Sequence, residues 1–105
     1  MSMMSQRKIQ EKLRVLGKKH TWRILTHIQK GSKYITQISV ETNIPYTTVQ
    51  HRVRELERAG LVRIVNQVDQ ETGRAIKLVR VSNFRINLTP VDIVRMVEKT
   101  NEPVA

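Results

Sequence analysis

The segment TQISVETNIPYTTVQHRVRELERAGLV, residues 36–62, sets the fold prediction for the whole chain. It opens with a short helix, for which the Thr36 hydroxyl is predicted to be the N-cap. Asn43 follows where the chain needs a left-handed residue, a conformation that Asn tolerates better than other non-glycine residues. Pro45 then fits the start of a second helix, where its missing N–H costs nothing. Two helices joined by such a short turn predict a helix-turn-helix over about residues 36–59.

The second helix, predicted over residues 45–58, has an apolar face and a polar face. Val49, Val53 and Leu56 are spaced four and three apart, which places them on one buried side. On the other side, Arg54 matches the two acceptors of guanine, O6 and N7, and Gln50 matches the N6 donor and N7 acceptor of adenine, if the helix enters a DNA major groove. The candidate recognition residues are Tyr46, Thr47, Thr48, Gln50, His51, Arg52 and Arg54. A merely solvated face is the alternative, and for His51 a base contact, a phosphate contact and plain exposure all stay open.

After Gly60 the pattern changes from helical periodicity to short runs rich in Val and Ile. Residues 61–68 and 75–81 are predicted strands, and DQETGR at 69–74 is the loop between them. The resulting hairpin, about residues 61–82, carries the basic candidates Arg63, Arg74, Lys77 and Arg80. Arg74 lies in the loop, where it is suited to reach phosphate or the minor groove, although Asp69 and Glu71 oppose this. Further along, we expect three apolar residues to seal the hairpin against the helices: Phe84, Ile86 and Leu88.

The remaining segments are predicted to be helical, apart from an extended connector at residues 32–35. A helix over 6–16 and another over 21–30 precede the connector, and the second buries Ile24, Leu25 and Ile28. Trp22 is interpreted as core or interface packing rather than as a stacking residue. A last helix, about residues 90–100, begins at the sequence TPVD, in which Thr89 caps and Asp92 favours the helix N-terminus.

The last helix is apolar around more than half of its circumference, which exceeds what one core contact needs. Exposed apolar helix surface usually marks an interface, so we expect this helix and the first one to form a two-fold dimer. The candidate interface residues are Ile9, Leu13, Leu16, Val91, Val94 and Val97. The alternative is a closing helix on a monomer.

The predicted order of elements, α-α-(β)-α-α-β-β-α, is that of a winged helix-turn-helix. Two pieces, HTWRILTHIQKG at 20–31 and ISVETNIPYTTVQHRVRELERAGLVR at 38–63, resemble the ArsR-type branch of bacterial and archaeal transcription regulators, with MarR-type regulators a weaker match. The resemblance covers roughly residues 9–97 and implies a mostly helical α+β fold and a DNA-binding regulator, more often a repressor. The length of the chain predicts a single domain over residues 1–105.

Metal sensing does not follow from this resemblance. Metal-sensing members of the family use Cys ligands near the recognition helix, or Asp and His pairs on the last helix. This sequence has no Cys, and its last helix has Asp92 and Glu98 but no His. We therefore expect neither a metal nor a cofactor, and no effector can be named from the sequence.

Charge points to a polyanionic partner. The 105 residues carry a formal net charge of +10, and residues 1–33 hold nine basic residues against one acidic residue. Surfaces of this kind usually bind nucleic acid, so we expect duplex DNA as the partner. Seven of these nine lie within residues 7–23: Arg7, Lys8, Lys12, Arg14, Lys18, Lys19 and Arg23. The residues that we assign to the DNA backbone are Thr36, Lys18, Lys19 and Arg23.

Other functional classes find little support. The chain has no glycine-rich phosphate loop, no His-Glu-x-x-His pattern and no nucleophile elbow, so we expect no enzyme. Its apolar runs are too short to span a membrane, and we expect a cytoplasmic, nucleoid-associated protein.

Three functions remain open at this stage. The first is a dimeric, sequence-specific transcription regulator that acts on a palindromic site. The second is a chromatin-like protein that organises DNA with little sequence preference. The third is a winged helix used for protein–protein assembly.

Overall fold

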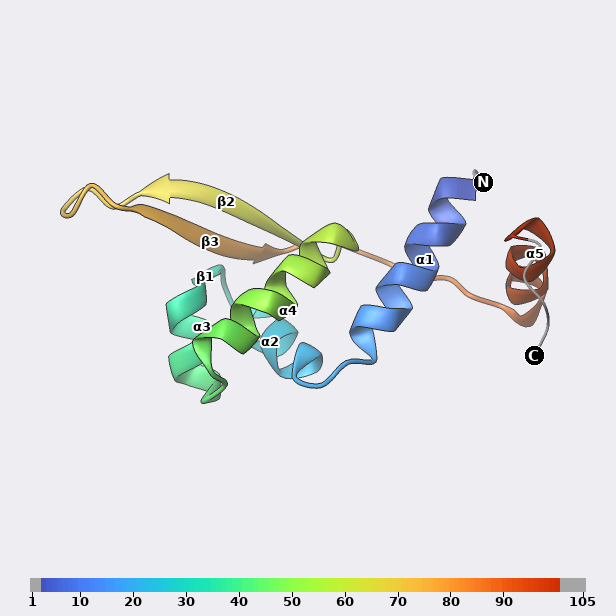
Figure 1. Cartoon of the computed structure of the whole chain (residues 1–105), viewed down its shortest axis with the longest axis horizontal. Helices are drawn as coiled ribbons and strands as arrows, with labels where there is room; N and C mark the ends of the chain where they lie inside the picture. Colours follow the sequence, from blue (N-terminus) through green and yellow to red (C-terminus); the bar gives the residue numbers. More distant parts are fainter. Residues whose placement is uncertain (1–2, 101–105) are drawn as a thin grey trace.

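The structure is a computed structural model that describes residues 3–100, including the side chains of residues 9–98. Its elements are α1 (Met3–Leu16), α2 (Thr21–Gln29), β1 (Lys33–Tyr34), α3 (Ile35–Thr42), α4 (Tyr46–Arg58), β2 (Val62–Val68), β3 (Ala75–Val81) and α5 (Pro90–Thr100) (Figure 1). This order confirms the predicted winged-helix architecture, mostly helical with a small sheet. Among the described residues, no helix has the length and apolar character that crossing a membrane requires.

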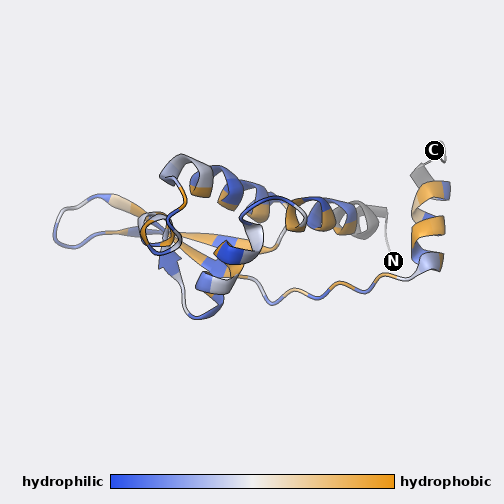
Figure 2. Ribbon diagram, turned by 90° about the horizontal axis from the view of Figure 1, so that it is seen from below, coloured by the Kyte–Doolittle hydropathy of each residue, from blue (hydrophilic) through white to orange (hydrophobic). Residues whose placement is uncertain are grey.

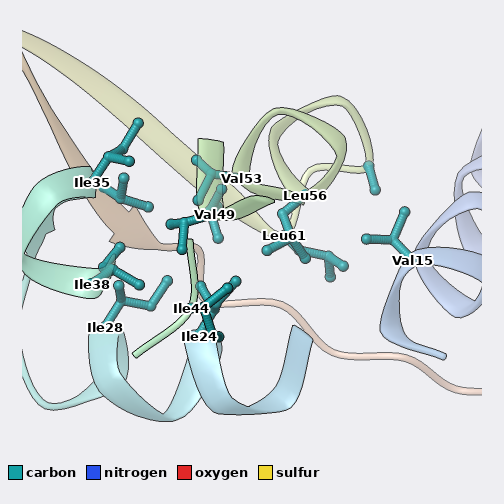
Figure 3. Close-up of a cluster of buried hydrophobic side chains, with 13 residues drawn as sticks. Val15, Ile24, Ile28, Ile35, Ile38, Ile44, Val49, Val53, Leu56 and Leu61 are labelled. Carbon is teal, nitrogen blue, oxygen red and sulfur yellow. The ribbon is translucent and has the colours of Figure 1, made fainter. Parts of the chain in front are cut away.

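The core lies where α2, α3 and α4 meet the base of the sheet (Figure 3). Ile24 of α2 is fully buried, as the helical spacing predicted, and so is Ile38 of α3. Burying one such side chain contributes about 1.5–3 kcal/mol, so this cluster supplies most of the drive for folding. The other buried members from these helices and the sheet are Ile28, Ile35, Val49, Val53, Leu56, Val62 and Val79.

Helix α1 joins the core only through its last turn. Val15, which the predicted face of Ile9, Leu13 and Leu16 left out, is fully buried, and Leu16 packs against the cluster. The Thr21 hydroxyl, at the start of α2, donates a hydrogen bond to the Val15 carbonyl over 2.9 Å. Because only this end of α1 reaches the core, Leu13 stays 40% exposed.

The helix-turn-helix is built by α3 and α4, but the predicted cap of α3 is wrong. Helix α3 begins directly after β1, so Tyr34 is the N-cap and Thr36 lies inside the first turn. The Gln37 side chain accepts a hydrogen bond from the Tyr34 N–H over 2.8 Å, and thereby caps this end of the helix. The predicted left-handed residue is confirmed, since Asn43 has φ 59° and ψ 30°. Pro45 is the residue immediately before α4.

Helix α4 ends as predicted, and the wing follows. Gly60 adopts φ 78°, and the Leu61 N–H donates to the Leu56 carbonyl over 2.9 Å, which closes the helix end. Strands β2 and β3 then form an antiparallel hairpin, and β1 pairs with β3 to give the order β1-β3-β2. The predicted strand limits are confirmed to within one residue.

The segment between β3 and α5 differs from the prediction. Of its three apolar residues, only Phe84 packs against the core, while Ile86 is half-buried and Leu88 is 36% exposed. Residues 82–89 run as an irregular strand-like connector that carries α5 beyond α1, to the end of the long axis (Figures 1 and 2). The predicted cap of α5 is confirmed, because Thr89 and Asp92 bond each other's backbone N–H at 3.0 and 3.2 Å.

Candidate nucleic-acid interface

Helix α4 presents a polar strip to solvent, as its spacing predicted. Thr47, His51 and Arg54 are exposed, Tyr46 is 44% exposed and Gln50 is half-buried. Val49 and Val53, on the other side of the helix, are fully buried and fix its orientation on the core. The exposed strip therefore projects from a rigid element, which is the arrangement that reading base edges requires.

The turn before α4 is held from three sides, which fixes where the helix begins. The Ser39 hydroxyl donates to the Ile44 carbonyl over 2.6 Å. The Thr42 hydroxyl accepts from the Ile44 N–H over 3.3 Å. From α2, the Arg23 guanidinium donates to the Thr42 carbonyl over 2.6 Å. Arg23, which the sequence assigned to the DNA backbone, thus uses at least one donor to hold the turn.

Arg52 does not lie on the exposed strip. Residues two apart are separated by about 200° around a helix, so Arg52 points almost opposite to Arg54. Its side chain is 13% exposed and forms an ion pair with Glu55 over 2.5 Å. We therefore withdraw Arg52 from the predicted recognition residues. Thr48 is also half-buried, at the margin of the strip.

Glu55 is the centre of a buried ionic cluster that connects α4 to the α1–α2 turn. Its side chain is 10% exposed, and Lys18 and Arg52 both bond to it. His51 lies 3.6 Å away on the solvent side. The hydrogen bond from Lys18 and the neighbouring positive charges hold the pKa of Glu55 below its usual value, against the opposing effect of burial. Lys18, predicted to contact DNA backbone, is instead engaged in this cluster.

A groove separates the start of α4 from the wing, and its lining combines polar, aromatic and basic residues with one acidic residue, Asp69. Tyr46 and Gln50 form one wall, and Arg74 and Lys77 form the other. Tyr34 and Thr36 close the groove from β1 and α3. The recognition helix and the wing thus line the same groove. Tyr34 adds an aromatic residue to it that was not among the predicted site residues.

The four basic residues predicted for the wing do not share one face. In the β2–β3 register Arg63 pairs with Arg80, and Ile64 pairs with the buried Val79. Because side chains alternate along a strand, Lys77 lies on the same sheet face as Val79, whereas Arg63 and Arg80 lie on the other. Arg80 also donates to the Ser32 hydroxyl over 3.3 Å.

The wing loop leaves its arginine available. The Asp69 N–H bonds the Arg74 carbonyl at 2.8 Å, and the Gly73 N–H bonds the Asp69 carbonyl at 2.7 Å, with Gly73 at φ 71°. The Asp69 carboxylate accepts from the Glu71 N–H at 2.9 Å, which lowers the pKa of Asp69. The carboxylate that opposed a DNA contact is thus turned into the loop. Arg74 is exposed and has no ion pair within the described side chains.

Other predicted contacts are placed less uniformly. Lys19 is exposed, whereas the side chains of Arg7 and Lys8 lie outside the described residues. His27, on α2, lies 3.2 Å from Glu41 of α3, a pairing that the sequence did not reveal. The hydrogen bond from Lys33 lowers the pKa of Glu41. Among the described residues, no group of three His, Asp or Glu side chains is arranged to hold a metal.

The residues predicted for a dimer interface are divided between two environments. Leu13 of α1 and Val91 and Val94 of α5 are exposed by 40%, 57% and 54%. Ile93, which the predicted interface omitted, is 49% exposed and adds to the apolar surface of α5. Ile9 and Val97 are half-buried, and Leu16 packs against the core.

Comparison with known proteins bears on the fold and the domain type. Residues 18–63 match the family model described as winged helix-turn-helix DNA-binding. No curated protein matches the sequence. One similar solved structure is described as a possible transcriptional regulator for arsenical resistance. It is 13% identical, with a TM-score of 0.55 over 87% of this chain and 81% of that chain. The predicted winged helix-turn-helix is thereby confirmed, and the ArsR-type resemblance has a counterpart in fold.

Proposed function

From the winged helix-turn-helix DNA-binding domain at residues 18–63, we propose that this protein is a transcription regulator that binds a palindromic duplex site as a homodimer. The observation that carries the proposal is the exposed polar strip of α4, from which Tyr46 and Gln50 line a groove shared with Arg74 and Lys77 of the wing. We assign repression by occlusion of the promoter as its mode of action. Residues 1–105 form one domain, in which α5 mediates dimerisation.

Reading of the site falls to the exposed strip of α4. Arg54 pairs with O6 and N7 of guanine, and Gln50 pairs with N6 and N7 of adenine, which are the bidentate contacts their side chains favour. Tyr46 and Thr47, at the N-terminal end of α4, contact phosphate or a thymine methyl. His51 lies beside them, and its role depends on the base sequence that it meets.

The wing holds the backbone beside the site. Arg74, exposed at the loop, contacts phosphate, and Lys77 supports it from the groove wall. Such contacts position the protein without reading sequence.

Replacing Arg74 with Ala tests the wing assignment. We expect weaker binding to every duplex by the same factor, and a salt dependence that is flatter by about one unit in log–log slope. Arg63→Ala is the matched control, because it removes the same charge from the base of the same hairpin, where the side chain does not line the groove. Fluorescence anisotropy over a salt series measures both. Loss of affinity for one sequence alone would contradict a phosphate contact.

Dimerisation is assigned to the exposed apolar residues of α1 and α5. Leu13, Val91 and Val94 are each at least 40% exposed. Exposure of apolar side chains to water is unfavourable, and packing against a second copy of the chain would bury them. A two-fold dimer places two recognition helices in successive major grooves, about one helical turn apart. This explains why we expect a palindromic site.

Val94→Asp is expected to dissociate the dimer. A charge placed in an apolar interface costs about 2 kcal/mol or more, which raises the dimer dissociation constant by about 30-fold. Val40→Asp is the matched control, since Val40 of α3 is 81% exposed and outside the proposed interface. Sedimentation over a concentration series distinguishes the variants. A native chain that sediments as a monomer at all concentrations would rule out the dimer.

A second function, DNA organisation with little sequence preference, is favoured by one observation. The net charge is +10, and nine basic residues lie within residues 1–33. Binding of that kind is driven by counterion release and is steeply salt-dependent, with nearly equal affinity for all duplexes. The ratio of specific to non-specific affinity therefore separates the two functions.

A further inference from the structure

Trp22 is the only tryptophan of the chain, and it is 73% exposed. The sequence predicted that it would pack in the core or in an interface, and the core reading is wrong. Its position on α2 is well fixed, because α2 begins at the buried Thr21 and the Thr26 hydroxyl donates to the Trp22 carbonyl over 2.7 Å. An indole is large, apolar and rigid, which makes an exposed one a frequent anchor of protein interfaces.

The indole forms one side of a recess at the α1–α2 turn. The apolar part of the recess is completed by Leu16 and by Gly17, which contributes no side chain. Its rim is basic, since Lys19 and Arg23 line it and are exposed. An apolar recess with a cationic rim is complementary to a bulky apolar side chain that is flanked by carboxylates.

This recess is separate from the proposed DNA surface. None of its lining residues lines the groove between α4 and the wing. The α1–α2 turn and the wing tip also lie far apart along the long axis of the molecule (Figure 1). In duplex DNA the bases are stacked on one another, so an exposed indole finds no free base to stack on.

A second copy of the chain is also disfavoured as the occupant. A copy would need free carboxylates to bind the basic rim, and the chain has only nine acidic residues against 19 basic ones. Several of its carboxylates are already engaged, among them Glu11 with Arg14, Glu41 with Lys33, and Asp92 with the Thr89 N–H.

We propose that the Trp22 recess docks a short acidic segment of another protein, with an apolar side chain against the indole and carboxylates on Lys19 and Arg23. The site leaves the recognition helix and wing free, so the partner and DNA bind at the same time. The inference goes beyond the proposed function and does not depend on sequence-specific DNA binding, because the partner can be assayed on the free chain.

A displayed library of random twelve-residue peptides is the probe. Peptides that bind the native chain at physiological salt are selected. Those that also bind Trp22→Ala are then removed, because they bind elsewhere, for example at the DNA-binding surface. We expect enriched peptides to combine several acidic residues with an aromatic or large aliphatic residue. Addition of an enriched peptide that lacks tryptophan should shift the emission of Trp22, the one tryptophan of the chain, to shorter wavelength.

Variants then locate the contact. We expect Trp22→Ala and Lys19→Glu each to weaken the selected peptide at least tenfold, as measured by anisotropy of the labelled peptide. Lys30→Glu, an equal charge change at the far end of α2, should alter the affinity less than threefold. Circular dichroism and duplex affinity of Trp22→Ala should match the native chain, which shows that it folds.

Three results would overturn the proposal. One is a selection that enriches no acidic, apolar peptide dependent on Trp22. A second is a shift of Trp22 emission on adding duplex DNA, with loss of DNA affinity in Trp22→Ala, which would make the recess a DNA contact. A third is an altered sedimentation coefficient of Trp22→Ala, which would make it a contact between copies of this chain.

Discussion

Glu55→Ala should destabilise the protein by about 2 kcal/mol, because it leaves two cations, Lys18 and Arg52, without their partner in a poorly solvated site. Removing one member of a fully buried pair costs about 3–5 kcal/mol. We reduce that figure because the Lys18 side chain is 35% exposed and water screens it. The Arg52 Nε is also buried and has no hydrogen-bond partner within the described residues, so the guanidinium depends on Glu55.

Urea unfolding measures this effect as a lower midpoint at an unchanged slope. Glu57→Ala is the matched control, because Glu57 is exposed on the same helix and its removal should change stability by less than about 0.5 kcal/mol. Equal midpoints for the two variants would show that the cluster contributes nothing to stability.

The same cluster predicts a pH dependence. The pKa of Glu55 is lower in the folded protein than its ordinary value of 4.5. A carboxylate of this kind binds more protons in the unfolded state, so it stabilises the fold above its unfolded pKa. That contribution is lost as the pH falls below 4.5 and through the folded pKa. The stability difference between the native chain and Glu55→Gln should therefore shrink on acidification, and a difference that grows would contradict the assignment.

Arg54→Ala should lower affinity for the cognate duplex by about 1–3 kcal/mol, which is roughly 5- to 150-fold, and leave random DNA nearly unaffected. The reason is that the guanidinium forms two hydrogen bonds with one base, and those bonds exist only on the correct sequence. Arg54→Lys keeps the charge but loses the paired geometry, so it should bind random DNA as the native chain does and recover little of the affinity for the cognate duplex.

Arg58→Ala serves as the control for charge. Arg58 lies one turn further along the same face of α4, away from the end that reaches the bases. We expect its loss to reduce specific and random binding by the same factor. Anisotropy titrations with both duplexes compare the variants. An equal loss on both duplexes for Arg54→Ala would reassign Arg54 to phosphate.

Local signals in the sequence were sufficient for most of the fold. Asn43 and Gly60 adopt the left-handed conformations that end α3 and α4. Each helix end is therefore determined by residues that are close together in the sequence. The strands of the wing follow from runs of Val and Ile around one loop. The N-cap of α3 was predicted wrongly because α3 begins directly after β1. The position of β1 is fixed by its pairing with β3, whose residues are far away in the sequence.

The site was predicted less completely, because tertiary contacts decide it. Lys18 and Glu55, which form an ion pair, are 37 residues apart in the sequence, so no local sequence pattern predicts their contact. Arg52 could have been recognised, since the 3.6-residue period already places it on the side of Val49 and Val53. The opposite faces of Arg63 and Lys77 follow only from the β2–β3 register.

Sequence-specific binding of duplex DNA is the central claim, and one measurement tests it most directly. A random duplex library is selected with the native chain, and anisotropy then compares the enriched duplex with a scrambled duplex of equal length across a salt series. We predict an affinity ratio of about 10³ or more at physiological salt, on a palindromic sequence. Equal affinities for the two duplexes, or a library from which no sequence is enriched, would contradict it.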